Sequence, residues 1–244
     1  MAKRIVLASG KGGVGKSTTA AMLGACLAKN EKRTLLIDCD AGLNTLRLLM
    51  EDVDHKPYDW LDAATGACDF EIAVCKMTPF LSLVNAPPTI PSELPETCIR
   101  DLVSAVEKDY DFVLLDAPAG LGAGLKRAAL AAGSALILAT ADAVSVQGAE
   151  RTDALLKSWG VEETRLIINR YDVKAARRGN YFDIDTTIDR TLVQLIGVVP
   201  EDKALTALSV TKKLPPRSKS LAAFGRIARR LQGENVSLTH AMLK

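Results

Sequence analysis

The sequence predicts an α/β fold with a doubly wound, mostly parallel sheet and helices on both faces. Short apolar runs recur along the 244 residues, with helical stretches between them. The runs are continuously apolar, as expected for parallel strands covered on both faces. The first run leads into a glycine-rich loop that opens a helix. These observations favour a single domain over residues 1–244.

The predicted strands follow from apolar, strand-like runs in chain order. They cover residues 4–9, 34–40, 111–118, 135–141, 165–170 and 196–200. The predicted helices cover residues 16–29, 96–108, 122–132, 145–158, 184–195 and 218–232. Strand and helix therefore alternate, which implies a doubly wound sheet. The less regular stretch from Glu51 to Pro95 is interpreted as an excursion of the same domain. It contains "YDWLDAATGA", predicted as a short helix, and "LSLVNAPPTIPSELP", predicted as a strand and a proline-rich loop.

Composition narrows the class of protein. Hydrophobic residues make up 48% and charged residues 25%, which suits a soluble globular protein. The net charge of +2 is too balanced to indicate a nucleic-acid binder. Five cysteines form no CxxC pair and no zinc spacing, so we expect a reducing cytoplasm and no transition-metal site. We also expect no secretory leader, and no apolar run approaches the ~20 residues of a membrane span.

Residues 10–17, "GKGGVGKS", match the phosphate-binding pattern G-x-x-x-x-G-K-[ST] between a strand and a helix. Glycines let backbone N–H groups converge on phosphate oxygens. Lys16 is expected to reach the β- and γ-phosphates of a nucleotide, and Ser17 to ligate Mg²⁺. The loop positions expected to bind the nucleotide are Gly12, Gly13, Val14, Gly15, Lys16, Ser17 and Thr18.

Acidic residues end two of the predicted strands. Asp38 ends one, with Asp40 just beyond it, and Asp116 ends another. A single such Asp could instead be a helix cap or a turn residue. Three of them beside a phosphate-binding loop favour a magnesium site, with Asp38 and Asp116 as its acids.

The order of five motifs adds a family resemblance. "KGGVGKST", "DCDAGL", "DYDFVLLDAPAGLG", "NR" after a strand and "GVVPED" follow one another within residues 3–232. Together they resemble the MinD branch of the MinD/ParA family of deviant Walker A P-loop ATPases. The resemblance implies a P-loop NTPase fold, Mg²⁺-dependent hydrolysis of ATP to ADP and phosphate, and an ATP-dependent homodimer. It also implies division-site positioning through a regulatory or effector protein.

The resemblance also implies individual roles. Lys11, the extra lysine of the loop, would cross to the partner subunit's nucleotide, and Asp40 would orient the attacking water. Asn169 would meet the adenine edge, with Arg170 against the base. The other side of the adenine pocket would be closed by Pro200, Glu201 and Asp202.

Two departures leave the partners open. Thr45 and Arg47 stand where the family usually has Asn and Asp, so the identity of the client protein is not predicted. Residues 218–232 are expected to pack as the last core helix, and the tail "NVSLTHAMLK" is a poor interfacial anchor. We therefore expect weak or no membrane affinity, while a peripheral position at the membrane stays open.

The basic clusters at 174–178 and 211–219 are short and expected to be solvated, so we do not expect DNA binding. Two alternatives for the function remain. One is a ParA-like or flagellar-number regulatory ATPase, and the other is an ATP-dependent biosynthetic or carrier relative.

Overall fold

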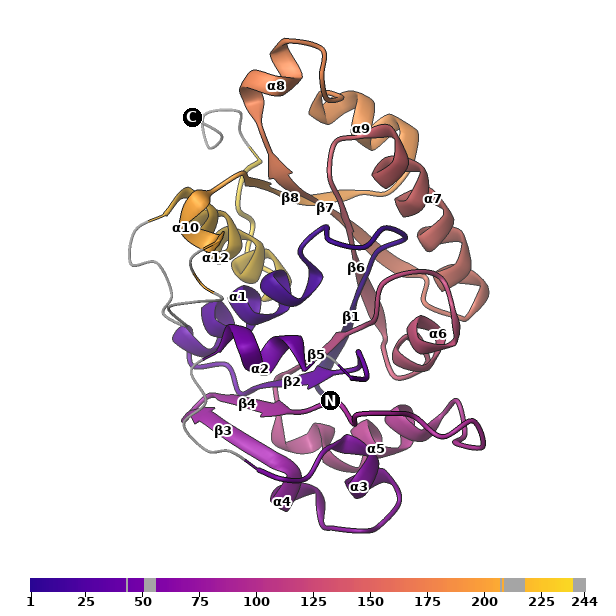
Figure 1. Cartoon of the computed structure of the whole chain (residues 1–244). Coiled ribbons are helices and arrows are strands. Elements are labelled where there is room, and N and C mark those ends of the chain that lie inside the picture. Colours follow the sequence, from indigo (N-terminus) through magenta and orange to yellow (C-terminus); the bar gives the residue numbers. More distant parts are fainter. Residues whose placement is uncertain (43, 51–55, 207, 209–217, 239–244) are drawn as a thin grey trace.

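A computed structural model describes residues 1–42, 44–50, 56–206, 208 and 218–238 of the chain (Figure 1). Within these ranges the strands form one eight-stranded sheet in the order β3-β4-β2-β5-β1-β6-β7-β8. All neighbouring strands run parallel except β3, which pairs antiparallel with β4. The strands are β1 (Lys3–Ala8), β2 (Thr34–Asp38), β3 (Val74–Thr78), β4 (Leu81–Val84), β5 (Phe112–Asp116), β6 (Ser134–Ala139), β7 (Glu163–Tyr171) and β8 (Leu195–Pro200).

Helices cover both faces of this sheet (Figure 1). One face is packed by α1 (Lys16–Lys29), α2 (Thr45–Leu49) and α12 (Lys219–Leu231), and the other by α5 (Cys98–Val106), α6 (Ala123–Leu130) and α7 (Ala143–Ser158). The remaining helices are α3 (Trp60–Ala64), α4 (Phe70–Ala73), the 3-10 helix η1 (Glu107–Asp109), α8 (Val173–Arg177), α9 (Ile184–Thr191) and α10 (Lys203–Thr206). Alternate residues of β1 enter the two separate cores, Ile5 on the α1 side and Val6 on the α5 side. This two-sided burial explains the continuously apolar strand sequences.

The predicted fold class is confirmed, and the strand boundaries agree to within two residues for most strands. The irregular stretch after Met50 contributes β3 and β4 to the same sheet, with the predicted short helix present as α3. The short elements β3, α2 and α8 were not predicted. Each has only five residues, too short for hydrophobic periodicity to be read.

The C-terminal helix α12 packs in the core, as predicted from its apolar face. Phe224, Ile227 and Ala228 are buried among residues of α1 and the strands. Arg230, in the last turn of the helix, donates hydrogen bonds to the carbonyls of Val236 and Ser237 beyond it. The end of the predicted tail (239–244) and most of the basic cluster at 211–219 lie outside the described residues.

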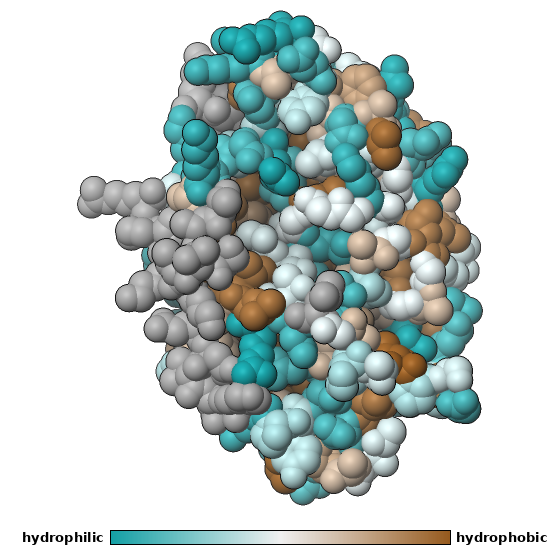
Figure 2. Space-filling view, in the orientation of Figure 1, coloured by the Kyte–Doolittle hydropathy of each residue, from teal (hydrophilic) through white to brown (hydrophobic). Residues whose placement is uncertain are grey.

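Two observations describe the surface and its relation to a membrane. Among the helices in the described ranges, none has both the length and the apolar character needed to cross a membrane. In Figure 2, hydrophobic residues of the visible face lie in separate patches among hydrophilic ones. The described residues of this face therefore form no single broad apolar surface.

Candidate nucleotide site

The carboxyl ends of the parallel strands bring the predicted site together. β1 leads into the glycine-rich loop, β2 ends at Asp38 and β5 ends at Asp116. Asp38 and Asp116 are register partners on neighbouring strands. Open parallel sheets bind ligands at this edge. Motifs that lie far apart in the sequence thus meet at one edge of the sheet.

The loop between β1 and α1 has a backbone that only glycine adopts easily. Gly13 has φ of 76° and Gly15 has φ of 94°, in the left-handed region. A Cβ atom on Gly15 would also lie 2.6 Å from the Asn169 amide nitrogen, and one on Gly10 would lie 2.6 Å from the carbonyl oxygen of Gly148 in α7. The loop therefore needs its glycines both for conformation and for close packing.

Lys16 begins α1 and is buried, with 8% of its surface exposed. Its ammonium donates a hydrogen bond to the Ser9 hydroxyl at 3.1 Å, and that hydroxyl donates to the carbonyl of Lys11. Burial lowers the pKa of Lys16 from its usual value, while Asp116 and Asp40 act against this shift. Among the described residues, the ammonium has only this hydroxyl as a hydrogen-bond partner, and such a buried cation is suited to receive an anion.

Asp116 is fully buried, and within the described structure neither carboxylate oxygen has a hydrogen-bond partner. Burial raises the pKa of Asp116 to about 7. The nearby Ser17 hydroxyl and Lys16 lower it, although Ser17 makes no hydrogen bond of normal geometry to either oxygen. Two unpartnered buried oxygens next to a hydroxyl fit the oxygen-rich shell that Mg²⁺ requires.

Asp38 is also buried, but unlike Asp116 its carboxylate accepts hydrogen bonds within the chain. Its two oxygens accept hydrogen bonds from the backbone N–H groups of Asp40 at 3.0 Å and Leu46 at 3.2 Å. Burial raises the pKa of Asp38 to about 6, and these two hydrogen bonds limit the rise. Asp38 therefore shapes the turn that carries Asp40, in addition to lying beside Asp116.

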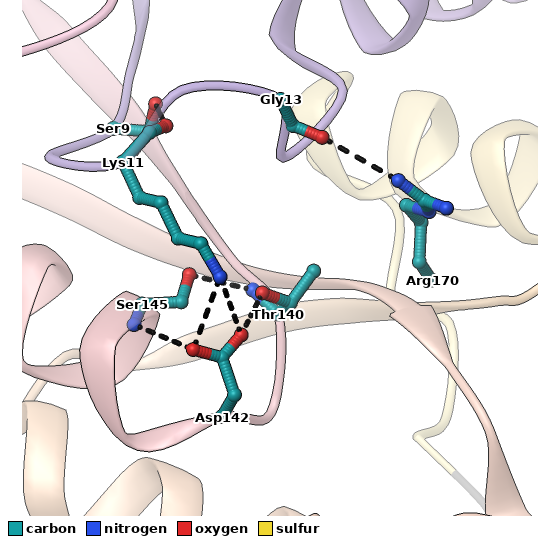
Figure 3. A network of polar contacts seen from close by, with 7 residues as sticks. All are labelled: Ser9, Lys11, Gly13, Thr140, Asp142, Ser145 and Arg170. Atoms are coloured by element: carbon teal, nitrogen blue, oxygen red, sulfur yellow. Dashed lines mark hydrogen bonds and ion pairs between the residues drawn. The ribbon is translucent and has the colours of Figure 1, made fainter.

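Lys11, the lysine expected to reach a partner subunit's nucleotide, has a side chain that is 41% exposed and that pairs within its own chain. Its ammonium forms an ion pair with Asp142 of the same chain, at 3.1 Å and 3.2 Å from the two oxygens (Figure 3). Asp142 is the N-cap of α7 and also accepts from Thr140 and the Ser145 N–H. Burial raises the pKa of Asp142, but these hydrogen bonds and Lys11 outweigh it and hold the pKa below its usual value.

The residues predicted to face the base lie at the ends of β7 and β8. The Asn169 amide donates to the carbonyl of Val14 at 2.8 Å, and its oxygen is buried with no partner among the described residues. Arg170, at a positive φ of 54°, forms an ion pair with Glu201 at 3.0 Å. Its guanidinium also lies 3.5 Å from the Gly13 carbonyl, as Figure 3 shows. Both predicted base-side residues thus contact the phosphate-binding loop.

The last predicted positions follow β8. Pro200 is its final residue and is a register partner of Tyr171. Asp202 accepts from the N–H of Ala204 and from the hydroxyl of Ser220 at 2.7 Å. Asp202 therefore ties the start of α10 to α12, and its carboxylate is engaged within the protein.

Sequence reasoning missed Asp142 as a partner of Lys11. An Asp between an apolar run and a helical stretch does indicate a helix N-cap. Nothing in this local pattern links position 142 to a lysine 131 residues earlier. Trp60, whose indole reaches Asp38, was also missed, because the predicted short helix gave no sign of its neighbours.

Similarity to known proteins agrees with this geometry. The model of the family described as "AAA domain" matches residues 2–163. A septum site-determining protein MinD from Bacillus subtilis (strain 168) is 33% identical over 247 residues, covering 98% of this chain and 92% of that protein. A protein of the same name from Helicobacter pylori is 32% identical over 250 residues, covering 97% of this chain and 92% of that protein.

Solved structures show the same similarity. A chain of the MinC:MinD cell division protein complex from Aquifex aeolicus superposes with a TM-score of 0.90 at 31% identity, covering 98% of this chain and 99% of that one. The septum site-determining protein MinD complexed with Mg-ADP from Pyrococcus horikoshii has a TM-score of 0.83 at 25% identity, with 95% and 96% covered.

Proposed function

This chain belongs to the MinD branch of the MinD/ParA family of ATPases, and we propose that it is an ATP-driven dimerisation switch in division-site positioning. In this role it hydrolyses ATP to ADP and phosphate with Mg²⁺, and it acts through an effector protein. One continuous sheet supports the proposal that residues 1–244 form a single P-loop ATPase domain.

The observation that carries the proposal is the unpartnered charge around the phosphate-binding loop. Lys16 is buried with only a hydroxyl as partner, and Asp116 has two buried oxygens without partners among the described residues. Such groups cost folding free energy unless a ligand satisfies them. Phosphate oxygens would satisfy Lys16, and a hydrated Mg²⁺ would satisfy Asp116.

The reaction requires little covalent chemistry from the protein. Residues 12–18 would bind the phosphates through backbone N–H groups and Lys16. Ser17, Asp38 and Asp116 would hold Mg²⁺, whose charge would neutralise the oxygens between the β- and γ-phosphates. Asp40, which is half-buried and follows the turn shaped by Asp38, would orient the attacking water.

The second lysine explains why hydrolysis would depend on the dimer. In the single chain, the Lys11 ammonium is engaged by Asp142. We propose that this ion pair opens on dimerisation and that Lys11 then contacts the partner subunit's nucleotide. A cation supplied in trans stabilises the charge on the transferred phosphoryl group as an arginine finger does.

The base and the protein partner involve other surfaces. Asn169, Arg170 and residues 200–202 would form the adenine site, with the amide of Asn169 facing the base edge. An effector protein is supported by the similarity to the MinC:MinD complex. Thr45 and Arg47 lie at the start of α2, close to Asp40 in the sequence, so they would distinguish this chain's partner from those of its relatives.

We further propose that the protein is cytoplasmic, with weak or no membrane affinity and no DNA binding. The described part of the tail, up to residue 238, is held back on the protein by Arg230. The cluster at 174–178 has few residues with which to bind a DNA backbone.

Size-exclusion chromatography with Mg²⁺ and either ADP or ATP tests the proposed function. We expect a monomer with ADP and a dimer with ATP, together with slow phosphate release. Repeating the run with anionic liposomes and with duplex DNA should leave the elution unchanged. A monomer with both nucleotides, or no phosphate release, would contradict the switch. ATP-dependent binding to DNA would instead favour a ParA-like role.

A further inference from the structure

We propose that Trp60 is a positioning residue for ATP hydrolysis, because its indole N–H fixes the backbone of the turn that carries Asp38 and Asp40. This inference rests on the proposed function, since it concerns the acids at the same site. Trp60 is the first residue of α3 and is fully buried. Its indole nitrogen donates a hydrogen bond to the carbonyl of Asp38 at 3.0 Å.

The peptide group that joins Asp38 to Cys39 is held at both ends. Trp60 holds its carbonyl, and its N–H, which belongs to Cys39, donates to the carbonyl of Asp116 at 3.0 Å. The plane of this peptide is therefore fixed between the indole and the strand that ends in Asp116. The orientation of the plane determines where the Asp38 side chain and the following turn are directed.

The Asp38 carboxylate in turn holds the backbone of Asp40. It accepts from the backbone N–H groups of Asp40 and Leu46, which closes the turn between β2 and α2. A rotation of the peptide plane would move the Asp38 carboxylate and would loosen the turn. Catalytic groups displaced by as little as 1 Å can lose much of their effect.

Trp60 is itself held firmly. Asp59 and Asp62 form a capping box at the start of α3, in which each side chain accepts from the other residue's backbone N–H. The backbone N–H of Trp60 donates to the carbonyl of Asn85 at 3.2 Å. The two residues after Asn85 also contact the segment between β2 and α2. The Ala86 N–H donates to the Asn44 side chain, and the Pro87 carbonyl accepts from the Gly42 N–H.

Core packing alone does not account for a tryptophan here. A phenylalanine or leucine could fill an apolar space at the start of a short helix, but neither has an N–H group. A buried indole N–H needs an acceptor, and here the acceptor is the carbonyl of a predicted metal ligand. The hydrogen bond is therefore the feature to test separately from the ring.

The test replaces Trp60 with 3-benzothienylalanine, in which sulfur takes the place of the indole N–H in a ring of nearly the same shape. The matched control places the same residue at Trp159, at the C-terminal end of α7 and outside the site. A second variant, Trp60→Phe, removes the N–H with a natural residue. Tryptophan inserted at position 60 by the same suppression route serves as the rescue.

Steady-state hydrolysis is measured at saturating Mg²⁺, with binding of a fluorescent ATP analogue measured in parallel. For the position 60 isostere we expect kcat to fall about 5- to 10-fold, the effect of one buried hydrogen bond. KM and the affinity for the analogue should change less than ~2-fold, because the phosphate-binding loop is intact. The Trp159 control and the rescued protein should match the unaltered chain.

Three results would overturn the inference. One is an unchanged kcat for the position 60 isostere while the unaltered chain hydrolyses ATP, and this leaves the proposed function standing. Another is a loss of analogue binding equal to the loss in kcat, which would assign Trp60 to folding alone. No hydrolysis by the unaltered chain would reject the proposed function and the inference with it. Should Trp60→Phe fail to fold, the isostere alone decides.

Discussion

The phosphate side and the base side of the site differ in how far their polar groups are satisfied. On the phosphate side, Asp116 has no partner among the described residues and Lys16 has only the Ser9 hydroxyl. On the base side, Arg170 pairs with Glu201, and Asp202 binds Ser220 and the N–H of Ala204. The phosphate side therefore depends on ligand charge, whereas the charged groups of the base side already have partners within the chain. The Asn169 amide oxygen is the exception on the base side, because it is buried without a partner among the described residues. Substitutions on the two sides should therefore differ in the size and kind of their effects on nucleotide binding and hydrolysis.

Lys16→Ala should have the largest effect, because it removes the buried cation of the phosphate side. We expect ATP binding and hydrolysis to fall by about 10³-fold or more. Binding of a fluorescent ATP analogue and phosphate release measure the two losses. Lys16→Arg serves as the control, because it keeps the positive charge but changes the shape of the side chain. Retention of near-normal hydrolysis by the alanine variant would show that Lys16 does not contact the phosphates.

Lys11→Ala should reduce hydrolysis by about 10³-fold while leaving ATP binding largely intact, by analogy with arginine fingers. Its ammonium is paired with Asp142 in the single chain, so nucleotide binding should not require it. The ATP-dependent dimer should also be weakened. Analogue binding, phosphate release and size-exclusion chromatography separate these three effects.

Mixing Lys11→Ala with Asp40→Ala distinguishes action in trans from action in cis. If Lys11 acts in trans, each mixed dimer contains one site with an intact Asp40 and an intact lysine from the partner subunit. Partial activity should then return. If Lys11 acts in cis, both sites of a mixed dimer are damaged and hydrolysis stays at background. Asp40→Ala alone should bind ATP and accumulate as a dimer.

Asp116→Asn should stabilise the nucleotide-free protein at pH 8 while abolishing Mg²⁺-dependent hydrolysis. Because burial raises the pKa of Asp116 to about 7, the folded protein keeps this carboxyl protonated at a pH where the unfolded chain has lost the proton. The resulting stability is complete below pH ~4 and is lost as the pH rises through about 7. Above that, a buried carboxylate without a partner costs about 1 to 3 kcal/mol.

Urea unfolding without Mg²⁺ at pH 6 and pH 8 measures this effect. The unaltered chain should be less stable at pH 8, and Asp116→Asn should lose much of this difference. Asp189→Asn removes the same charge from an exposed position on α9. It should change the free energy of unfolding by no more than ~0.5 kcal/mol at either pH. If the unaltered chain is equally stable at both pH values and Asp116→Asn is no more stable at pH 8, then Asp116 is not a buried carboxyl with a raised pKa.

Arg170→Ala on the base side should have the smallest effect. The Arg170 and Glu201 side chains are 55% and 43% exposed, so their ion pair contributes about 1 kcal/mol or less. We expect ATP affinity to fall by about 5-fold or less, with kcat unchanged. Competition between ATP and GTP for the analogue checks base selectivity, and Glu201→Gln is the matched control. A fall in kcat as large as that of Lys11→Ala would abolish the contrast between the two sides.

The sequence predicted the parts of this site that local patterns encode. The phosphate-binding loop depends on glycines and a lysine within a few residues, and Asp38 and Asp116 each end a strand. Residues 10–18, Asp38 and Asp116 could therefore be predicted as one candidate site, and the structure brings them to one edge of the sheet. The partner of Lys11 could not, because the Asp142 contact depends on how α7 packs against the loop through Gly10 and Gly148. The antiparallel edge strand β3 was missed because its five residues alternate only briefly between buried and exposed.

The buried indole of Trp60, which is hydrogen-bonded to the Asp38 carbonyl, gives the chain its own fluorescent reporter. Tryptophan emission responds to polarity and to hydrogen bonding at the ring nitrogen, and the chain has only two tryptophans, Trp60 and Trp159. With Trp159→Phe, all tryptophan emission comes from a ring that donates a hydrogen bond to the carbonyl of Asp38, at the start of the turn that carries Asp40. Rapid mixing with ATP and Mg²⁺ would then follow that turn in real time. Whether the emission changes before or after phosphate appears would order the movement relative to the chemical step, without any attached dye.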